Sequence, residues 1–347
     1  MIKVCPVSEK EQWDSIVNSF SNHDVYYLNG YVNSFKIHGD GEPLLFYYES
    51  DGLRGINIVM KRDIAKSPMF ENHLPENTYF DFSTPYGYGG WIFEGSTEKI
   101  SDAFSEYESW CRNNSIISEF VRFHPVLNND DCSKNFYDVV TLGNTVCLDI
   151  STPEIIWSNI TSKNRNIIRK AEKSGVEILQ SKDWEIYHKF IDIYNQTMDN
   201  DNADSYYYFS EDFYKSICVD MSDNSRIFYA VKDDKIIAAS IILSQNSKLT
   251  YHLSGSLFEY RMFAPTNLLL YKAALWGCET GCKTFHLGGG VGSGEDSLFK
   301  FKKSFYRNDD LPFFSIGKKI FDQQKYDFLV SMREETNSSY FPKYRAN

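Results

Sequence analysis

Residues 283–307 read KTFHL-GGGVGSG-EDSLFKFKKSFYR, a pattern that predicts a buried strand, a glycine loop and a basic helix. Five of the seven residues from Gly288 to Gly294 are glycine, which allows positive φ and close backbone approach to a ligand. The free N–H groups at the start of the helix favour an anion or a developing negative charge. A flexible surface loop is the alternative interpretation.

The helix after this loop is expected to bury one apolar face. Leu298, Phe301 and Phe305 have helical spacing and would form that face. Lys302 then lies at its edge, where its stem can pack while its ammonium reaches out. The alternative is a solvated lysine on a basic helix face.

Two nucleotide-binding patterns do not fit the glycine run. A P-loop closes with Gly-Lys-Ser/Thr, whereas Gly294 is followed by Glu295. The glycine spacing also differs from the G-x-G-x-x-G of a dinucleotide-binding turn.

The composition predicts a cytoplasmic protein of two domains. The chain has 347 residues, and 16% of them are aromatic. The net charge of −11 argues against DNA as a partner and leaves room only for a local basic patch. The seven cysteines suit a reducing compartment, and no apolar run approaches the ~18 residues of a membrane-spanning helix. Cys278, Cys282 and His286 are spaced by four, but Gly281 would end the helix between them, so no metal site is predicted.

Each half of the chain shows the same order of predicted elements. Helices precede a β-hairpin, at 44–60 in the first half and at 226–243 in the second. A further strand, a loop, a helix and a strand follow in both halves. A last strand at 312–316 and a last helix at 318–335 complete the pattern. We therefore expect a tandem α/β fold, two copies facing each other across a shared cleft.

The hairpin–strand–loop–helix–strand order is that of the GNAT acyltransferases, in which the strands flanking the helix splay apart around the acyl donor. Within that superfamily, the second half resembles the FemABX-type peptidyl transferases, which contain two GNAT-like domains. Four stretches carry the resemblance: Ser162–Val176, with its basic K-x-R-x-x-I-R-K-A pattern, Tyr260–Pro265, Gly281–Gly289 and Leu298–Phe305. In the first half, Tyr27–Lys36 and Asp81–Gly90 match more weakly.

The resemblance implies a first, acceptor-side domain of residues 1–150 completed by 318–347, and a second, donor-side domain of residues 151–317. It also implies acyl or aminoacyl transfer to an amine of a cell-envelope precursor, with aminoacyl-tRNA as the donor in well-understood members. Lys302 matches the family lysine near the donor ester, and Lys36 matches the one near the acceptor phosphates. The chain departs from the family in lacking an inserted helical arm. The Tyr206–Phe209 run, which includes Tyr207, stands about where the family's phosphate-binding arginine is expected.

The chemistry favours direct attack by the amine. No Ser/Cys–His–Asp order suggests an acyl-enzyme, and amide formation needs a held carbonyl and a stabilised oxyanion. Lys302 offers the positive charge. Tyr251, His252 and His286 lie on the two strands expected to splay and are candidates to relay a proton, or ordinary strand residues.

The remaining candidate residues are assigned to donor and acceptor binding. Thr161–Lys173 carries five basic residues and one Glu, so it either binds a phosphate of tRNA, acceptor or CoA, or is a solvated helix face. The donor set is Phe301, Arg261, Gly288, Gly289, Gly290, Lys163, Arg165 and Arg169. The acceptor set is Lys36, Asp81, Tyr86 and Tyr207. Arg261 begins a loop resembling the GNAT pyrophosphate loop, although Pro265 removes a donor N–H from it.

Three functions remain open from the sequence. The first is aminoacyl or acyl transfer to a peptidoglycan peptide amine, with tRNA as a partner and peripheral contact with the membrane. The second is acyl-CoA-dependent N-acylation of an amino sugar for surface polysaccharide. The third is a non-catalytic binding protein with the same fold. No tightly bound cofactor is expected in any of them.

Overall fold

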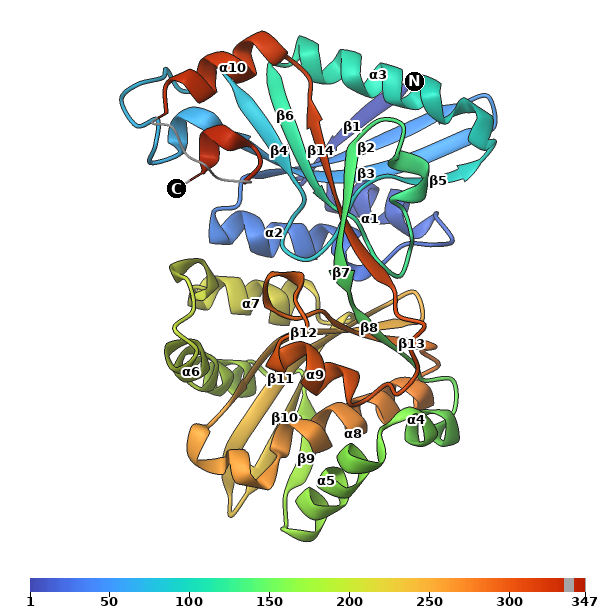
Figure 1. Ribbon diagram of the computed structural model, residues 1–347, viewed down its shortest axis with the longest axis vertical. Helices are drawn as coiled ribbons and strands as arrows, with labels where there is room; N and C mark the ends of the chain where they lie inside the picture. The colour runs from blue at the N-terminus through green and yellow to red at the C-terminus, as the bar shows by residue number, and fades with distance from the viewer. Residues whose placement is uncertain (334–339, 347) are drawn as a thin grey trace. The chain divides into compact units, whose positions relative to one another are not determined.

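The computed structural model describes residues 1–333 and 340–346, and the chain forms two compact units (Figure 1). The first comprises Met1–Leu142 and Phe314–Asn347, and the second comprises Gly143–Phe313. The second unit is thus inserted into the first. These boundaries differ from the expected ones at residues 150 and 317. The difference arises because the strand Val146–Asp149 pairs within the second sheet and Phe313–Ile320 pairs within the first.

The first unit is built on an eight-stranded sheet. The strands, in spatial order, are β1 (Ile2–Pro6), β2 (Glu42–Ser50), β3 (Leu53–Asp63), β4 (Phe80–Ser83), β6 (Ile116–Arg122), β14 (Phe313–Ile320) and β7 (Asp138–Asn144), with β5 (Ile92–Gly95) paired to β3. Neighbouring β4 and β6 are parallel, while β6 and β14 are antiparallel. Figure 1 shows α3 (Ile100–Asn113) and α10 (Gln323–Ser331) on one face of this sheet. On the other face lie α1 (Lys10–Asn18) and α2 (Asn29–His38).

The second unit is built on a six-stranded sheet with the same internal order. Its strands are β8 (Val146–Asp149), β13 (Thr284–Gly288), β12 (Lys248–Ser256), β11 (Lys235–Gln245), β10 (Ser225–Lys232) and β9 (Glu177–Ser181). The helices are α4 (Pro153–Asn159), α5 (Ser162–Lys173), α6 (Trp184–Asn200), α7 (Glu211–Asp220), α8 (Pro265–Glu279) and α9 (Ser297–Lys303). Here β12 and β13 are the parallel pair, joined through α8. The prediction of two α/β copies in tandem is confirmed.

Both hairpins turn through residues in the left-handed region, which matches the twist of paired strands. Asp51 and Gly52 have φ of 49° and 78° between β2 and β3. Asp233 and Asp234 have φ of 49° and 60° between β10 and β11. Short acidic turns therefore fix the register at the same point of each unit.

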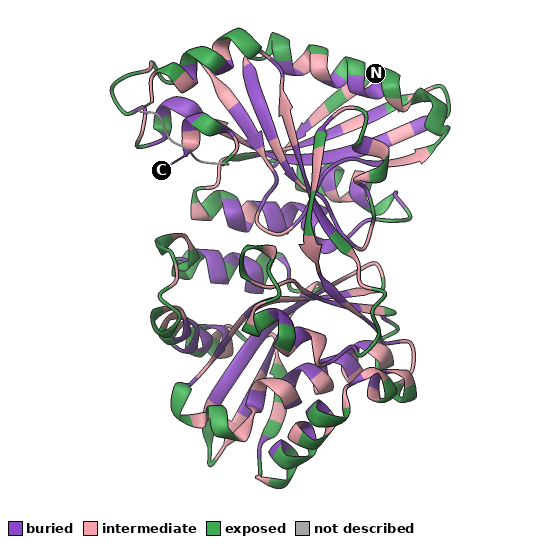
Figure 2. Cartoon of the chain, viewed as in Figure 1, coloured by how far each residue is buried: buried purple, intermediate pink, exposed green. Residues whose placement is uncertain are grey.

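Each unit has its own hydrophobic core, drawn as the purple interior strands in Figure 2. In the first unit, Trp91 and Tyr107 are fully buried and pack edge to face at 5.2 Å. In the second, Phe285 of β13 packs with Leu269 of α8 in one cluster. Burial of this kind contributes about 25 cal/mol per Å² of apolar surface.

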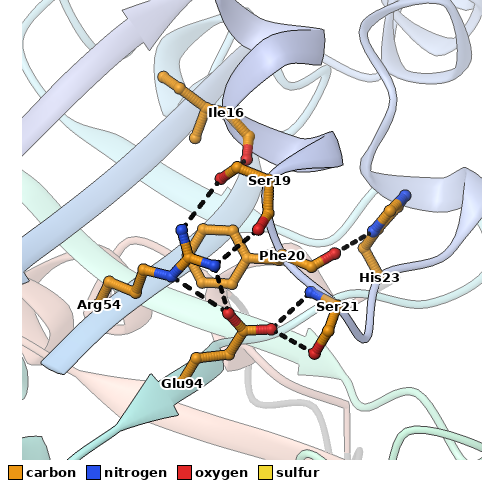
Figure 3. Close-up of polar contacts among 7 residues, drawn as sticks. All are labelled: Ile16, Ser19, Phe20, Ser21, His23, Arg54 and Glu94. Atoms are coloured by element: carbon orange, nitrogen blue, oxygen red, sulfur yellow. Dashed lines mark hydrogen bonds and ion pairs between the residues drawn. The ribbon is translucent and has the colours of Figure 1, made fainter.

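Polar contacts hold the segment after α1 against the first sheet (Figure 3). Arg54 of β3 donates to Glu94 of β5 at 2.6 Å and to the carbonyl of Ser19 at 2.6 Å. The other Glu94 oxygen accepts from the backbone N–H of Ser21 at 2.5 Å, and the Arg54 guanidinium lies 4.6 Å from the Phe20 ring centroid. The pairing lowers the pKa of Glu94 against the opposing effect of its partial burial.

The C-terminal segment is anchored by a buried carboxylate. Asp81 of β4 accepts from Arg62 at 2.8 Å and also from Arg345, and Tyr344 donates to it at 3.1 Å. Tyr344 is fully buried, and its hydroxyl also lies 2.8 Å from that of Ser118. The expected helix over 318–335 is partly wrong: residues through Ile320 continue strand β14, and the helix runs from Gln323 to Ser331. Residues 334 and 335 of that prediction lie outside the described residues.

Candidate active site

The second unit has an opening where its two parallel strands separate. β12 and β13 pair only from Lys248 and Thr284 to Thr250 and His286. Beyond Thr250, β12 continues to Ser256 and remains paired with β11. On β11, Ser240 and Ile242 are two residues apart, whereas their partners on β12, Ser254 and Tyr251, are three apart. One extra residue of β12 therefore lies between Tyr251 and Ser254, as in a β-bulge. The predicted splay and its two strands are present.

Tyr251 and His252 lie at the mouth of this opening. Because of the bulge, Tyr251 falls on the same face of β12 as Ser254, whose hydroxyl accepts from Ser240 at 2.7 Å. Burial raises the pKa of Tyr251, while hydrogen bonds from Ser254 and Ser240 oppose the rise. Loss of hydration lowers the pKa of His252 to about 3, so its imidazole is neutral at physiological pH.

Lys302 of α9 points into the same opening. Only 8% of the residue is exposed, and its Nζ lies 5.9 Å from the Tyr251 ring centroid. The Nζ donates to the carbonyl of Gly289 at 2.7 Å. Burial lowers the pKa of Lys302 to about 8, and the charge of Asp296 works against that fall. The site thus holds an ammonium whose remaining N–H groups are not used by the Gly289 contact.

The buried face of α9 is not the predicted one. Phe299 and Lys302 are buried, whereas Leu298 is exposed and Phe301 is only partly buried. Asp296 caps the helix at its first turn and thereby sets its rotation. Lys302 is therefore on the inner face itself and not at its edge, and Phe301 packs edge to face with Phe305 at 5.6 Å.

The glycine loop is closed by contacts of its own. Gly288 has φ of 78° and Gly292 has φ of 59°, conformations that favour glycine. A Cβ at Gly290 would lie 2.2 Å from the carbonyl oxygen of Gly294 and 2.4 Å from Oδ1 of Asp296. The loop serves here to place the Gly289 carbonyl against Lys302.

The basic helix α5 has a structural arginine. Arg165 donates to the carbonyls of Trp157 and Ile160 at 3.2 and 2.9 Å, which are the last acceptors of α4. Arg169 lies over the Trp157 ring at 5.0 Å and donates to Asn166. Lys163 is exposed. The assignment of Arg165 to donor binding is corrected accordingly, because its guanidinium joins two helices.

The loop before α8 differs from an open phosphate loop. Ala264 has φ of 50° and precedes Pro265, which has no N–H at the first helical position. Arg261 lies 4.0 Å from Asp201 and over the ring of Phe258 at 5.1 Å. Its charge is thus partly matched within the unit.

The residues assigned to the acceptor are dispersed. In the first unit, exposed Lys36 pairs with Glu42 at 2.8 Å, and the Tyr86 ring stacks on Phe35 at 5.5 Å. Asp81 is fully buried and held by Arg62 and Arg345, so its assignment to acceptor binding is corrected. Tyr207 belongs to the second unit, where it is 36% exposed.

In the first unit, the space between the corresponding parallel strands, β4 and β6, is closed. Beyond β4, the N–H of Thr84 donates to the Phe120 carbonyl at 3.1 Å. The N–H of Gly89 donates to the Arg122 carbonyl at 2.8 Å, and Gly89 bridges to Phe123 in parallel. The loop of residues 84–89 therefore fills the position that stays open beside Tyr251.

Over residues 1–333 and 340–346, His, Cys, Asp and Glu side chains form no group of three or more suited to a metal ion. No helix in these ranges has the length and apolar character to cross a membrane.

Comparison with known proteins identifies the type of fold. Residues 161–303 match the model of the acetyltransferase (GNAT) domain family. The structure of FemX aligns with a TM-score of 0.67 at 13% identity, covering 92% of this chain and 98% of that one. The fold is of the FemABX type. A conserved protein of unknown function from Bacteroides thetaiotaomicron aligns with a TM-score of 0.59 at 10% identity, over 92% and 99% of the two chains.

One curated relative is similar in sequence. A UDP-N-acetylmuramoylpentapeptide-lysine N(6)-alanyltransferase of Weissella viridescens is 28% identical over 110 residues. These residues are 31% of this chain and 32% of that enzyme, so the match spans about a third of the relative's length. The double GNAT-like FemABX fold predicted from the sequence is confirmed.

Several residues of the site were not predicted. Asp296 acts on Lys302 and Ser240 acts on Tyr251 in the structure, and Gly289, which was expected to bind the donor, accepts from Lys302 through its carbonyl. Asp296 had a readable signal, because an Asp three residues before Phe299 is typical of a helix N-cap. The serine pair had none, since it depends on strand register.

Proposed function

We propose that this protein transfers an acyl or aminoacyl group to an amine on a bacterial cell-envelope precursor, most directly a peptidoglycan peptide amine. The observation that carries the proposal is the nearly buried ammonium of Lys302 beside Tyr251, where β12 and β13 separate. A positive charge held in a site shielded from water stabilises a developing oxyanion more strongly than one in water does. The similarity to an alanyltransferase supports the same chemistry.

The reaction is a direct attack. The acceptor nitrogen forms a bond to the donor carbonyl carbon, and the carbonyl oxygen becomes the oxyanion that Lys302 stabilises. The ester or thioester bond then breaks, and the proton lost by the amine goes to the leaving oxygen or sulfur. Tyr251 can carry that proton, because its hydroxyl both accepts and donates. His252, with a pKa lowered to about 3, is suited to accept a hydrogen bond but not to retain a proton.

The donor we favour is aminoacyl-tRNA. Pro265 and the left-handed Ala264 remove and redirect N–H groups at the start of α8, which weakens a pyrophosphate site there. Exposed Lys163 and Arg169 on α5 are the residues we assign to the donor phosphates, and Lys36, Tyr86 and Tyr207 those we assign to the acceptor.

A second candidate is acyl-CoA-dependent N-acylation of an amino sugar. It is favoured by the match of residues 161–303 to the acetyltransferase (GNAT) domain model. It requires the same carbonyl chemistry at Lys302 and differs in donor and acceptor.

The decisive experiment is a matrix of donors and acceptors. The protein is incubated with alanyl-, glycyl- or seryl-tRNA, or with acetyl- and longer acyl-CoAs. Each is combined with a nucleotide-linked muramoyl pentapeptide or a nucleotide-linked amino sugar, and mass spectrometry records the acceptor. We expect an aminoacyl mass gain on the pentapeptide amine that forms much more slowly with Lys302→Met. An acyl gain on the amino sugar would select the second candidate, and binding without any transfer would leave only the non-catalytic function.

A further inference from the structure

Resting on the proposed function, we propose that Asp296 is a positioning residue that holds the ammonium of Lys302 in place, charged, at the opening between β12 and β13. Asp296 touches no part of the expected substrates in this assignment. It acts through the glycine loop and through α9.

Asp296 ties the loop to the helix with its two carboxylate oxygens. Oδ1 accepts from the N–H of Phe299 at 2.8 Å, in the first turn of α9. Oδ2 accepts from the N–H of Val291 at 3.1 Å, inside the glycine loop. One side chain therefore fixes both the helix that carries Lys302 and the loop that carries its acceptor, the Gly289 carbonyl.

These contacts close a ring of short links. It runs from Lys302 Nζ to Gly289, through Gly290 to Val291, then to Asp296 and back along α9. Gly290 leaves the room that the carboxylate needs, since a Cβ there would lie 2.4 Å from Oδ1. Glycine at position 290 is thus explained by Asp296 and not by a ligand.

Asp296 also supplies negative charge that faces the ammonium of Lys302. Facing the ammonium are Asp296 from the loop and Tyr251 from β12, while Lys303 on the same helix is turned to Asp309 at 3.2 Å. Burial favours a neutral Lys302, and the Asp296 carboxylate favours the charged form. The backbone contacts of Asp296 keep its own pKa low, so the carboxylate stays ionised.

The test is Asp296→Asn, a change that keeps the size and the capping oxygen for Phe299 and removes both the charge and the acceptor of the Val291 N–H. Pulses of acetic anhydride at graded pH, read by mass spectrometry at Lys302, report the pKa of that amine without any donor or acceptor. We expect the midpoint of labelling to fall by about one pH unit. At pH 8, kcat should then fall about fivefold with KM unchanged, because less of the ammonium remains charged.

Asp309→Asn is the matched control, since it removes the same charge from the partner of the neighbouring Lys303 and should leave the Lys302 midpoint unchanged. If Asp296→Asn does not fold, Gly290→Ala displaces the carboxylate without changing the charge and should lower the midpoint in the same direction. An unchanged midpoint in the folded variant would overturn the role of Asp296. A shifted midpoint, together with a wild type that shows no turnover, would support the positioning and refute the proposed function.

Discussion

The Nζ of Lys302 donates a hydrogen bond to the carbonyl oxygen of Gly289 at a distance of 2.7 Å. This bond joins the helix after the glycine loop to the first part of the loop itself, directly after β13. An ammonium bonded in this way has one direction occupied and offers its other N–H groups to the space beside Tyr251. The geometry suits a charge that stabilises an oxyanion.

Replacing Lys302 by methionine is expected to reduce turnover by about 100- to 1000-fold, the usual cost of losing one oxyanion-stabilising group. KM should change little if the charge matters only in the transition state. In the wild type, kcat should decline above pH 8 as the ammonium, whose pKa is lowered to about 8, loses its proton.

Lys300→Met is the control for that experiment, because Lys300 is an exposed lysine of the same helix. Its rate should match that of the wild type, and both variants should be compared by thermal melts. Equal rates for wild type and Lys302→Met would remove Lys302 from the mechanism.

Two charge reversals on α5 should have different effects. Arg165→Glu is expected to destabilise the second unit by about 1.5–3 kcal/mol, because the carbonyls of Trp157 and Ile160 lose a charged donor. Lys163→Glu should leave the melting temperature unchanged while weakening donor binding and reducing its dependence on salt. Urea titrations and a binding series at several salt concentrations distinguish the two. An equal loss of stability in both would contradict the structural role of Arg165.

Glu119 should make the stability of the first unit depend on pH. It is buried between Tyr107 and Tyr137, which donate to it at 3.1 and 2.8 Å, and burial raises its pKa from 4.5 to about 7. Between these values the folded protein holds a proton that the unfolded chain has lost. The free energy of unfolding should therefore fall as pH rises from 4.5 to 7, by about 1.4 kcal/mol for each pH unit in that range.

Glu119→Gln removes this titration while retaining an acceptor for both tyrosines. Its new NH2 group takes the position of Oε1, which accepts from Nδ2 of Asn57 at 3.4 Å in the wild type, so the Asn57 amide must turn over for its buried Oδ1 to accept from the variant. Urea denaturation at pH 5 and pH 8 should show the variant gaining stability relative to the wild type at the higher pH. A constant difference at both values would rule out the titration of Glu119.

Asp81→Ala is expected to destabilise the first unit by about 3–5 kcal/mol, because the partly buried Arg62 and Arg345 would both lose the fully buried carboxylate that they share. Lys36→Met, at the exposed ion pair with Glu42, should not shift the melt measurably. Calorimetry of both variants provides the comparison. A small effect of Asp81→Ala would mean that water reaches the two guanidinium groups.

The architecture was predictable because it depends on local patterns. Residue spacing predicts the hairpins with Asp51-Gly52 and Asp233-Asp234 turns. It also predicts the strand, glycine loop and helix at 283–307. The last helix was predicted too early, since Lys318 to Ile320 have no alternation that separates a strand end from a helix start. Only pairing with β6 decides that they are extended.

The two strands of the candidate site were predictable, but the contacts around Lys302 were not. Which face of α9 is buried depends on the rotation set by the Asp296 cap, and this moved the inner face from Leu298 to Phe299. The roles of Asp81 and Arg165 were decided by residues outside their own elements, Arg345 in one case and the end of α4 in the other. Such partners cannot be inferred from the neighbourhood of a residue in the chain.

The first unit is assembled from two separate pieces of chain, so it can be completed only after the second piece has been synthesised. During synthesis, Asp81 and Ser118 leave the ribosome long before Tyr344 and Arg345, and all of Gly143–Phe313 is made in between. The second unit can fold while β6 still lacks its neighbour β14. A nascent chain stalled after residue 313 would carry one finished lobe and one with an open sheet edge, which is the stage at which a chaperone would have most to protect.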